Sequence, residues 1–161
     1  LSYRIQVQRN GHLTLSCAHP NCFEGNYADC DERAERRACK GNNTWVGGFE
    51  RTVDGKLYLQ CCKFELLPIY GERLLEFVKV RRGQFFEGKT KTVSKHDNYV
   101  IYFDVITNIR RVGNLSPRDV RNEHYELSVT RYTCGREPEF KPAWIKPNPW
   151  PFFDTKEGAV I

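Results

Sequence analysis

Two adjacent cysteines inside a strand-like stretch constrain the fold of this chain more than any other feature. Residues 55–67 read GKLYLQCCKFELL, which places Cys61 and Cys62 in an otherwise β-like segment. Successive strand residues point to opposite faces of a sheet, so the two thiols face different surroundings and need different partners. A bond between them would strain the peptide and break the strand ladder. We therefore predict two bridges that leave this strand from opposite faces and tie it into two layers.

The other cysteines extend this prediction to a disulfide framework. Six of the seven lie within the first 62 residues, none has C-x-x-C spacing, and the four histidines are scattered, so no zinc template is met. No metal site and no cofactor is predicted. The pattern is typical of an oxidising compartment, with three intramolecular bridges and one cysteine left unpaired or intermolecular. The cysteines are Cys17, Cys22, Cys30, Cys39, Cys61, Cys62 and Cys134.

Alternating apolar residues predict two β-hairpins in the first half of the chain. One covers residues 3–17 with a two-residue turn at Asn10-Gly11, and the other covers residues 43–64 with a turn at Asp54-Gly55. Gly47-Gly48, beside Trp45, indicates a bulge or a close backbone approach. Both hairpins belong to the half that carries most of the cysteines.

The segment ADCDERAERRACKG, residues 28–41, predicts the one short helix. It combines strong helix formers with acidic residues near its start, basic residues near its end and Gly41 as a stop. Cys30 and Cys39 would lie about 180° apart around such a helix, which prevents a bond between them. Each must therefore bond a different element.

The rest of the chain is predicted to be β-rich. Residues 73–82, 98–111 and 124–134 are rich in β-branched and aromatic residues, whereas 83–98 and 113–122 have the composition of loops. The sum is a mainly β protein, an antiparallel two-layered β-sandwich of about seven strands with one short helix and a disulfide-stapled N-terminal half. We expect a cysteine-rich β domain over 1–136 and an arm rich in proline and aromatic residues over 137–161.

Features of the chain also bear on its location. No run of 18 apolar residues exists, residues 1–10 lack a signal-peptide layout, and the absence of methionine predicts a chain that begins inside a longer precursor. The triplet NNT makes Asn42 a candidate N-glycosylation site. Together with the cysteines, this predicts a secreted, extracellular protein.

Basic residues concentrate in the second half. Between Lys79 and Arg136 there are twelve basic residues and six acidic ones, an excess larger than the +5 of the whole chain. In a secreted protein such a face fits sulfated glycosaminoglycans or other anionic matrix, although the same residues could merely solubilise strand edges. The candidates for polyanion binding are Lys79, Arg81, Arg82, Lys89, Lys91, Arg110 and Arg111.

That hypothesis carries a test by substitution. Replacing Arg81, Arg82, Arg110 and Arg111 with Ala should lower the salt needed for elution from heparin. The thermal midpoint should stay nearly unchanged if these charges are exposed. Nucleic acid is not an expected partner, because no stacking motif is present.

No catalytic residues are predicted, and the chain is interpreted as a non-enzyme. The one nucleophile and base on a common strand face, Ser128 and His124, lie about 13 Å apart along a strand, which is too far for a hydrogen bond. No motif selects a pair of carboxylates among the twenty acidic residues.

Six short segments carry a resemblance to a known group of proteins. In order they are PNCFEG, GNNTWVGG, DGKLYLQCC, GQFFEG, FDVITNIR and a late YTC. They resemble the cysteine-rich ectodomain of the nematode Hedgehog-related proteins, the Warthog, Quahog and Groundhog group, over roughly residues 17–134. The resemblance implies a secreted module from a precursor whose C-terminal Hint domain cleaves itself, acting in cuticle, moulting and epidermal biology. Neither Hint residues nor an N-terminal cysteine for acylation is present in this sequence.

Three classes of function remain open at this point. The first is a Hedgehog-related extracellular ligand or matrix-associated binding module, whose partner would be an extracellular receptor, a matrix component or a sulfated glycosaminoglycan. The second is a structural component of an apical extracellular matrix, crosslinked through the odd cysteine. The third is a secreted enzyme of unrecognised type, which would require a deep pocket with convergent polar groups.

Overall fold

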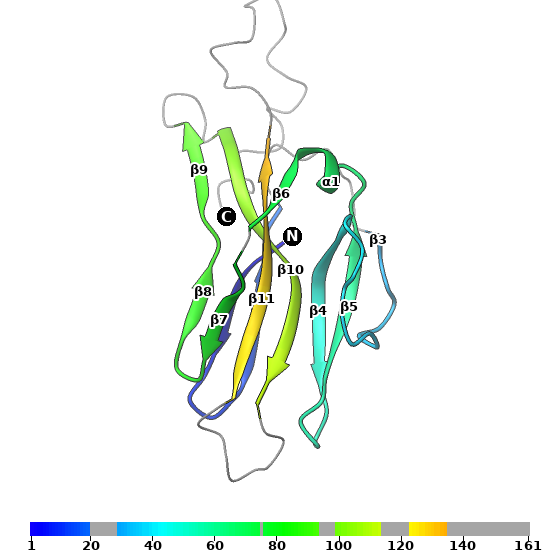
Figure 1. Ribbon diagram of the computed structural model, residues 1–161, viewed down its shortest axis with the longest axis vertical. Helices are drawn as coiled ribbons and strands as arrows, with labels where there is room; N and C mark the ends of the chain where they lie inside the picture. Colours follow the sequence, from blue (N-terminus) through cyan, green and yellow to red (C-terminus); the bar gives the residue numbers. More distant parts are fainter. Residues whose placement is uncertain (20–28, 75, 94–98, 114–122, 135–161) are drawn as a thin grey trace, which may run out of the picture.

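The fold consists of antiparallel strands and one short helix (Figure 1). This structure, a computed structural model, describes residues 1–19, 29–74, 76–93, 99–113 and 123–134. Every strand pairing in those residues is antiparallel, and the strands form three small sheets. The predicted mainly β class is therefore confirmed. The predicted arm over 137–161 lies outside the described residues.

The first sheet places β1 (Ser2–Val7) between β2 (Leu13–Cys17) and β8 (Phe85–Glu87). β1 and β2 form the predicted hairpin, but its loop has three residues instead of two, because the Gln8 amide donates to the His12 carbonyl at 2.8 Å. Gly11 has φ +88° and provides the left-handed residue that such loops need. β8 was predicted as loop, and that prediction is wrong: its backbone completes the free edge of β1.

The second sheet places β5 (Leu57–Lys63) between β3 (Asp29–Cys30) and β4 (Thr44–Arg51). The predicted hairpin of β4 and β5 is present, with a bulge between Val46 and Gly48. The predicted helix over 28–41 is wrong. Cys30 pairs with Cys62 in the β-ladder, and Arg36 exchanges backbone hydrogen bonds with Leu59. These bonds to β5 replace the bonds that a helix would make, so tertiary pairing overrides the local preference.

The third sheet is built on the two longest strands, β10 (Tyr99–Val112) and β11 (His124–Thr133). β9 (Thr90–Val93) pairs with β10, whereas β6 (Gly71–Arg73) and β7 (Val78–Arg81) both pair with β11. The strand predicted over 73–82 is thus mostly limited to β7, since β6 ends at Arg73, and the loop predicted over 83–98 contains β9 as well as β8. Both differences arise because long strands offer edges on which short segments pair.

The only helix in the described residues is α1 (Leu67–Tyr70), which the sequence analysis missed. Pro68 occupies the first turn, where its missing amide hydrogen is not needed, and Gly71 follows the last residue. Leu67 is buried, so the turn is anchored on the core.

Two hydrophobic clusters lie between the sheets. The larger one draws on all three sheets and includes Ile5, Leu59 and Tyr125, and β1 and β2 lie behind β7 and β11 in Figure 1. The smaller one surrounds Phe103 and Tyr132, whose ring centroids are 5.2 Å apart. β4 packs against β10 and links the second sheet to the third. The hairpin loops 8–12 and 52–56 lie at the lower end of the molecule in Figure 1.

Candidate functional site

The adjacent cysteines on β5 are bonded to two different partners. Cys61 bonds Cys39, and Cys62 bonds Cys30. The Cys39–Cys61 bridge belongs to the larger hydrophobic cluster, whereas Cys62 and Cys30 belong to the smaller one. Neighbouring residues of one strand therefore connect to two separate parts of the core, as the alternation of side chains predicts. Cys30 and Cys39 reach the same strand, however, and not the different elements that we expected.

Gly47 makes room for one of these bridges. A Cβ atom placed at Gly47 would lie 2.3 Å from the Cys62 Sγ atom and 3.6 Å from the Cys30 Sγ atom. No real Cβ tolerates the shorter contact. The glycine pair was interpreted as a bulge or a close backbone approach, and Gly47 provides both.

Two further cysteines are either free or disulfide-bonded in the structure. Cys17, at the end of β2, is free and exposed. Cys134, directly after β11, is disulfide-bonded. Cys22 lies outside the described residues.

The candidate glycosylation site Asn42 lies in an exposed turn before β4. Thr44, the third residue of its triplet, donates its hydroxyl hydrogen to the Gly41 carbonyl at 2.8 Å and is buried. The turn is thereby held in place, and the Asn42 side chain borders a cavity of about 520 Å³.

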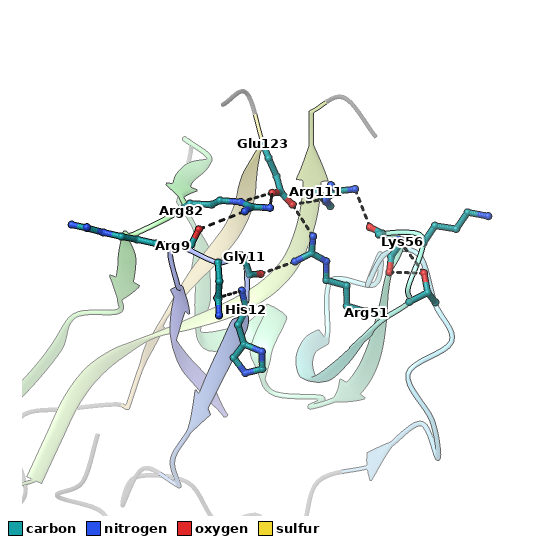
Figure 2. A network of polar contacts seen from close by, with 11 residues as sticks. Arg9, Gly11, His12, Arg51, Lys56, Arg82, Arg111 and Glu123 are labelled. Carbon is teal, nitrogen blue, oxygen red and sulfur yellow. Dashed lines mark hydrogen bonds and ion pairs between the residues drawn. The ribbon is translucent and has the colours of Figure 1, made fainter. Parts of the chain in front are cut away.

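A network of charges occupies the end of the molecule where the hairpin loops meet (Figure 2). Its centre is Glu123, the residue before β11, whose side chain is only 2% exposed. One carboxylate oxygen accepts hydrogen bonds from Arg111 at 2.8 Å and Arg51 at 3.0 Å. The other accepts from Arg82, with an N–O distance of 2.7 Å in the ion pair. Three arginines from β10, β4 and the turn between β7 and β8 therefore share one carboxylate.

The same arginines hold the hairpin loops. The Nη1 group of Arg51 donates to the Gly11 carbonyl at 2.6 Å, and that of Arg111 donates to the Gly55 carbonyl at 2.9 Å. Both glycines have a positive φ, +88° and +89°. Through Arg51 and Arg111, Glu123 thus joins β4, β10 and the two hairpin loops (Figure 2). The cluster keeps two excess positive charges, because three guanidinium groups face one carboxylate.

The pKa of Glu123 lies below its ordinary value of 4.5. Burial raises this pKa, but the hydrogen bonds from Arg111 and Arg82 and the charges of Arg111 and Arg51 lower it by more. The carboxylate therefore stays charged at neutral pH in spite of its burial.

The basic residues singled out from the sequence are divided between the two ends of the molecule. Lys79, Arg81 and Arg110 are exposed on the third sheet, near Glu126, which forms an ion pair with Arg110 at 2.9 Å. Lys91 pairs with Tyr102 on β10, and Lys89 immediately precedes its strand. Tyr102 lies eight residues from Arg110, or roughly 26 Å along the strand. The predicted set is therefore spread along the third sheet and does not form one compact cluster.

The structure also corrects the expected effect of the quadruple arginine variant. Arg81 and Arg110 are exposed, but the side chains of Arg82 and Arg111 are only 26% and 15% exposed and bind Glu123. Removing those two would leave a buried carboxylate with a single partner, which destabilises the fold. An unchanged thermal midpoint is therefore the wrong expectation for that variant. Neither Glu123 nor Arg51 was recognised from the sequence. The one sequence signal for Arg51 is its position near the turn glycine Gly55.

A second cavity, of about 240 Å³, opens beside this network. Its described lining includes the apolar residues Leu57 and Ile109 and the basic residues Arg37, Lys56, Arg110 and Arg111. Arg110 and Arg111 are neighbours on β10, so the Arg110 side chain points to the opposite face of the sheet, where it pairs with Glu126. No carboxylate from the described residues lines it. Such a pocket can accept an anionic group.

The described residues show no arrangement for covalent catalysis. Ser128 is buried and accepts a hydrogen bond from Arg73 at 3.2 Å, whereas His124 lies 3.6 Å from Glu126. The 520 Å³ cavity beside Asn42 has neither a histidine nor a carboxylate in its described lining. Within the described segments no group of three or more His, Cys, Asp or Glu side chains is placed to hold a metal ion. The described helix, four residues long, is far too short to span a bilayer.

Comparisons with known proteins agree on one family. The family described as the Warthog N-terminal signalling domain matches residues 1–135. The chain is 42% identical to Warthog protein 3 of Caenorhabditis elegans over 152 residues, 94% of this chain and 82% of that protein. It is 36% identical to Warthog protein 5 of the same organism with the same coverage. Identity to Warthog protein 1 is 31% over 111 residues, which cover 21% of that protein. No solved structure matches the chain.

Proposed function

This chain belongs to the Warthog N-terminal signalling domain family, and from that membership we propose that it is a secreted ligand or matrix-associated binding module of cuticle and epidermal biology. In this role it acts by binding and not by catalysis. Its partner would be an extracellular receptor or a matrix component.

The buried disulfides support the extracellular location. Cys39–Cys61 and Cys30–Cys62 both contribute to the hydrophobic clusters, so the fold depends on an oxidising compartment. The exposed position of Asn42 fits a glycan that stays in solvent. A binding role fits a surface whose cavities have no nucleophile and base in contact among the described residues.

A fluorescently tagged copy expressed from its natural locus tests the location. We expect the tag outside epidermal cells, and we expect the recovered protein to carry a glycan that is lost in an Asn42→Gln variant. Tag confined to the cytoplasm, together with alkylation of all cysteines before reduction, would rule out this proposal.

The structural matrix component remains a second candidate, because Cys17 is free and exposed. Crosslinking through this thiol would retain the protein in a detergent-resistant fraction until a reductant is added. A Cys17→Ser variant that becomes extractable by detergent alone would favour this candidate, whereas unchanged extraction would favour the soluble ligand.

A further inference from the structure

We propose that the cavity lined by the Arg37, Lys56 and Arg111 side chains binds a sulfate group of a sulfated polysaccharide. This inference rests on the proposed extracellular function, since that is where such chains occur. It differs from the set predicted from the sequence, because Arg37 and Lys56 enter the site and Lys89 and Lys91 leave it.

The site is assembled from three parts of the fold. Lys56 lies in the loop of the β4–β5 hairpin, Arg111 lies near the end of β10, and Arg37 lies in the segment that the Cys39–Cys61 bridge fastens to β5. The Arg37 guanidinium lies over the Tyr58 ring, 5.4 Å from its centre. Arg111 is fixed by Glu123 and by the Gly55 carbonyl. Two of the three cationic groups are therefore held in place before a ligand arrives.

Charge around the cavity is not balanced by the described carboxylates. Arg110 pairs with Glu126 at 2.9 Å, and Lys56 lies 3.7 Å from Asp54. The Glu123 cluster keeps two excess positive charges, and Arg37 has no ion pair with a described carboxylate. The cavity and the neighbouring Glu123 cluster together therefore carry an excess of three positive charges, although Arg51 and Arg82 of that cluster do not line the cavity. A group with several anionic oxygens would complete these interactions.

The size and surroundings of the cavity favour a polysaccharide over a membrane. A volume of about 240 Å³ corresponds to roughly eight water molecules, enough for one sulfated sugar residue with the rest of the chain outside. Of the large apolar side chains that are exposed among the described residues, Val53 shares the β4–β5 loop with Lys56. One valine is a weak membrane anchor, because each buried methylene group contributes only about 0.8 kcal/mol. Arginine forks, in contrast, match the geometry of a tetrahedral oxyanion.

The test compares the unmodified chain with two double variants, each of which removes two positive charges. Arg37→Gln with Lys56→Gln removes two charges from the cavity, and Lys89→Gln with Lys91→Gln removes two charges near β9. All four side chains are exposed, so both variants should melt like the parent protein. The ligand is a labelled heparin hexasaccharide, and binding is measured by fluorescence anisotropy at low and at physiological salt. We expect the Kd to rise roughly tenfold for the cavity variant and less than twofold for the control.

Three results would overturn the proposal. The first is an equal loss of affinity in both double variants, which would indicate general charge attraction. The second is full retention of binding by a desulfated hexasaccharide. The third is binding to phosphoinositide vesicles that depends on Arg37 and Lys56 while the hexasaccharide does not bind. None of these results bears on secretion, so a cytoplasmic tag would overturn the proposed function separately, without changing the measured Kd.

Discussion

At the scale of single residues, Glu123 has the largest set of partners at the loop end of the molecule. An isolated buried carboxylate is costly, but this one accepts hydrogen bonds from three arginines. Each arginine comes from a different part of the chain, and Arg51 and Arg111 continue to loop carbonyls. The carboxylate therefore determines how the ends of β4, β10 and β11 meet.

Replacing Glu123 with Gln should lower the free energy of unfolding by about 3 kcal/mol, the low end of the range for breaking a buried ion pair, since the arginines keep 15–26% exposure. Chemical denaturation at neutral pH measures this loss. Glu87→Gln is the matched control, because that carboxylate is 55% exposed and its ion pair with Arg4 is long, at 3.7 Å. The control should change stability by less than about 1 kcal/mol. Equal losses in the two variants would contradict the role of Glu123.

The contribution of Glu123 to stability also has a defined pH dependence. Because the pKa of Glu123 is lowered in the folded state, its contribution to stability is present above about pH 4.5 and is lost as the pH falls through the folded pKa. The parent protein should therefore lose more stability than Glu123→Gln between about pH 6.5 and about pH 3. Parallel curves for the two proteins would show that Glu123 has the same pKa in the folded and unfolded states.

At the scale of elements, β5 organises the N-terminal half. It pairs with β3 on one edge and β4 on the other, and its adjacent cysteines bond Cys30 in β3 and Cys39 in the segment that follows β3. The two bridges span 32 and 22 residues, so each stabilises the fold by roughly 3–4 kcal/mol in the chain-entropy account. The glycine bulge of β4 is part of the same unit, because it leaves space for the Cys62 sulfur.

A double-mutant cycle tests this dependence of the bulge on the bridge. Gly47→Ala should lower the thermal midpoint strongly in the parent protein, because the new Cβ would lie 2.3 Å from the Cys62 sulfur. In a Cys30→Ala, Cys62→Ala background the same change should have a much smaller effect, since the sulfur atoms are gone. Gly48→Ala serves as a control, because its nearest neighbour is the flexible end of Gln60, at 2.6 Å. Additive effects of Gly47→Ala and loss of the bridge would contradict the packing argument.

At the scale of the whole molecule, one bonded cysteine lies outside the stapled N-terminal half. Cys134, at the end of β11, is bonded, Cys17 is free, and four cysteines form the two bridges on β5. Of the seven cysteines in the sequence, Cys22 is the one that remains. By elimination we predict a third bridge between Cys22 and Cys134.

Peptide mapping without reduction tests this connectivity. We expect a linked peptide pair that contains Cys22 and Cys134, and an alkylated peptide that contains Cys17. The intact mass should rise by six hydrogens on reduction, because three bridges open. A covalent dimer linked through Cys134, or alkylation of Cys22 before reduction, would contradict the predicted bridge.

The sequence by itself determined the features that depend on local periodicity and chemistry. Strand alternation separates Cys61 from Cys62, and the positive φ of Gly11 and Gly55 follows from the turn signals RNG and VDG. The resemblance carried by short motifs correctly indicated the family. These features need only a few neighbouring residues.

Tertiary structure decided the features that depend on distant partners. Residues 28–41 have helical composition, yet disulfides and backbone bonds to β5 hold their described part, 29–41, in an extended and turning path. β8 and β9 exist because β1 and β10 present free edges, which no local pattern reveals. Clustering of basic residues in the sequence suggested one surface, but strand length separates Lys91 from Arg110, whereas folding brings Arg37 and Lys56 beside Arg111. A binding surface is defined by distances in space, and spacing along the chain does not determine those distances.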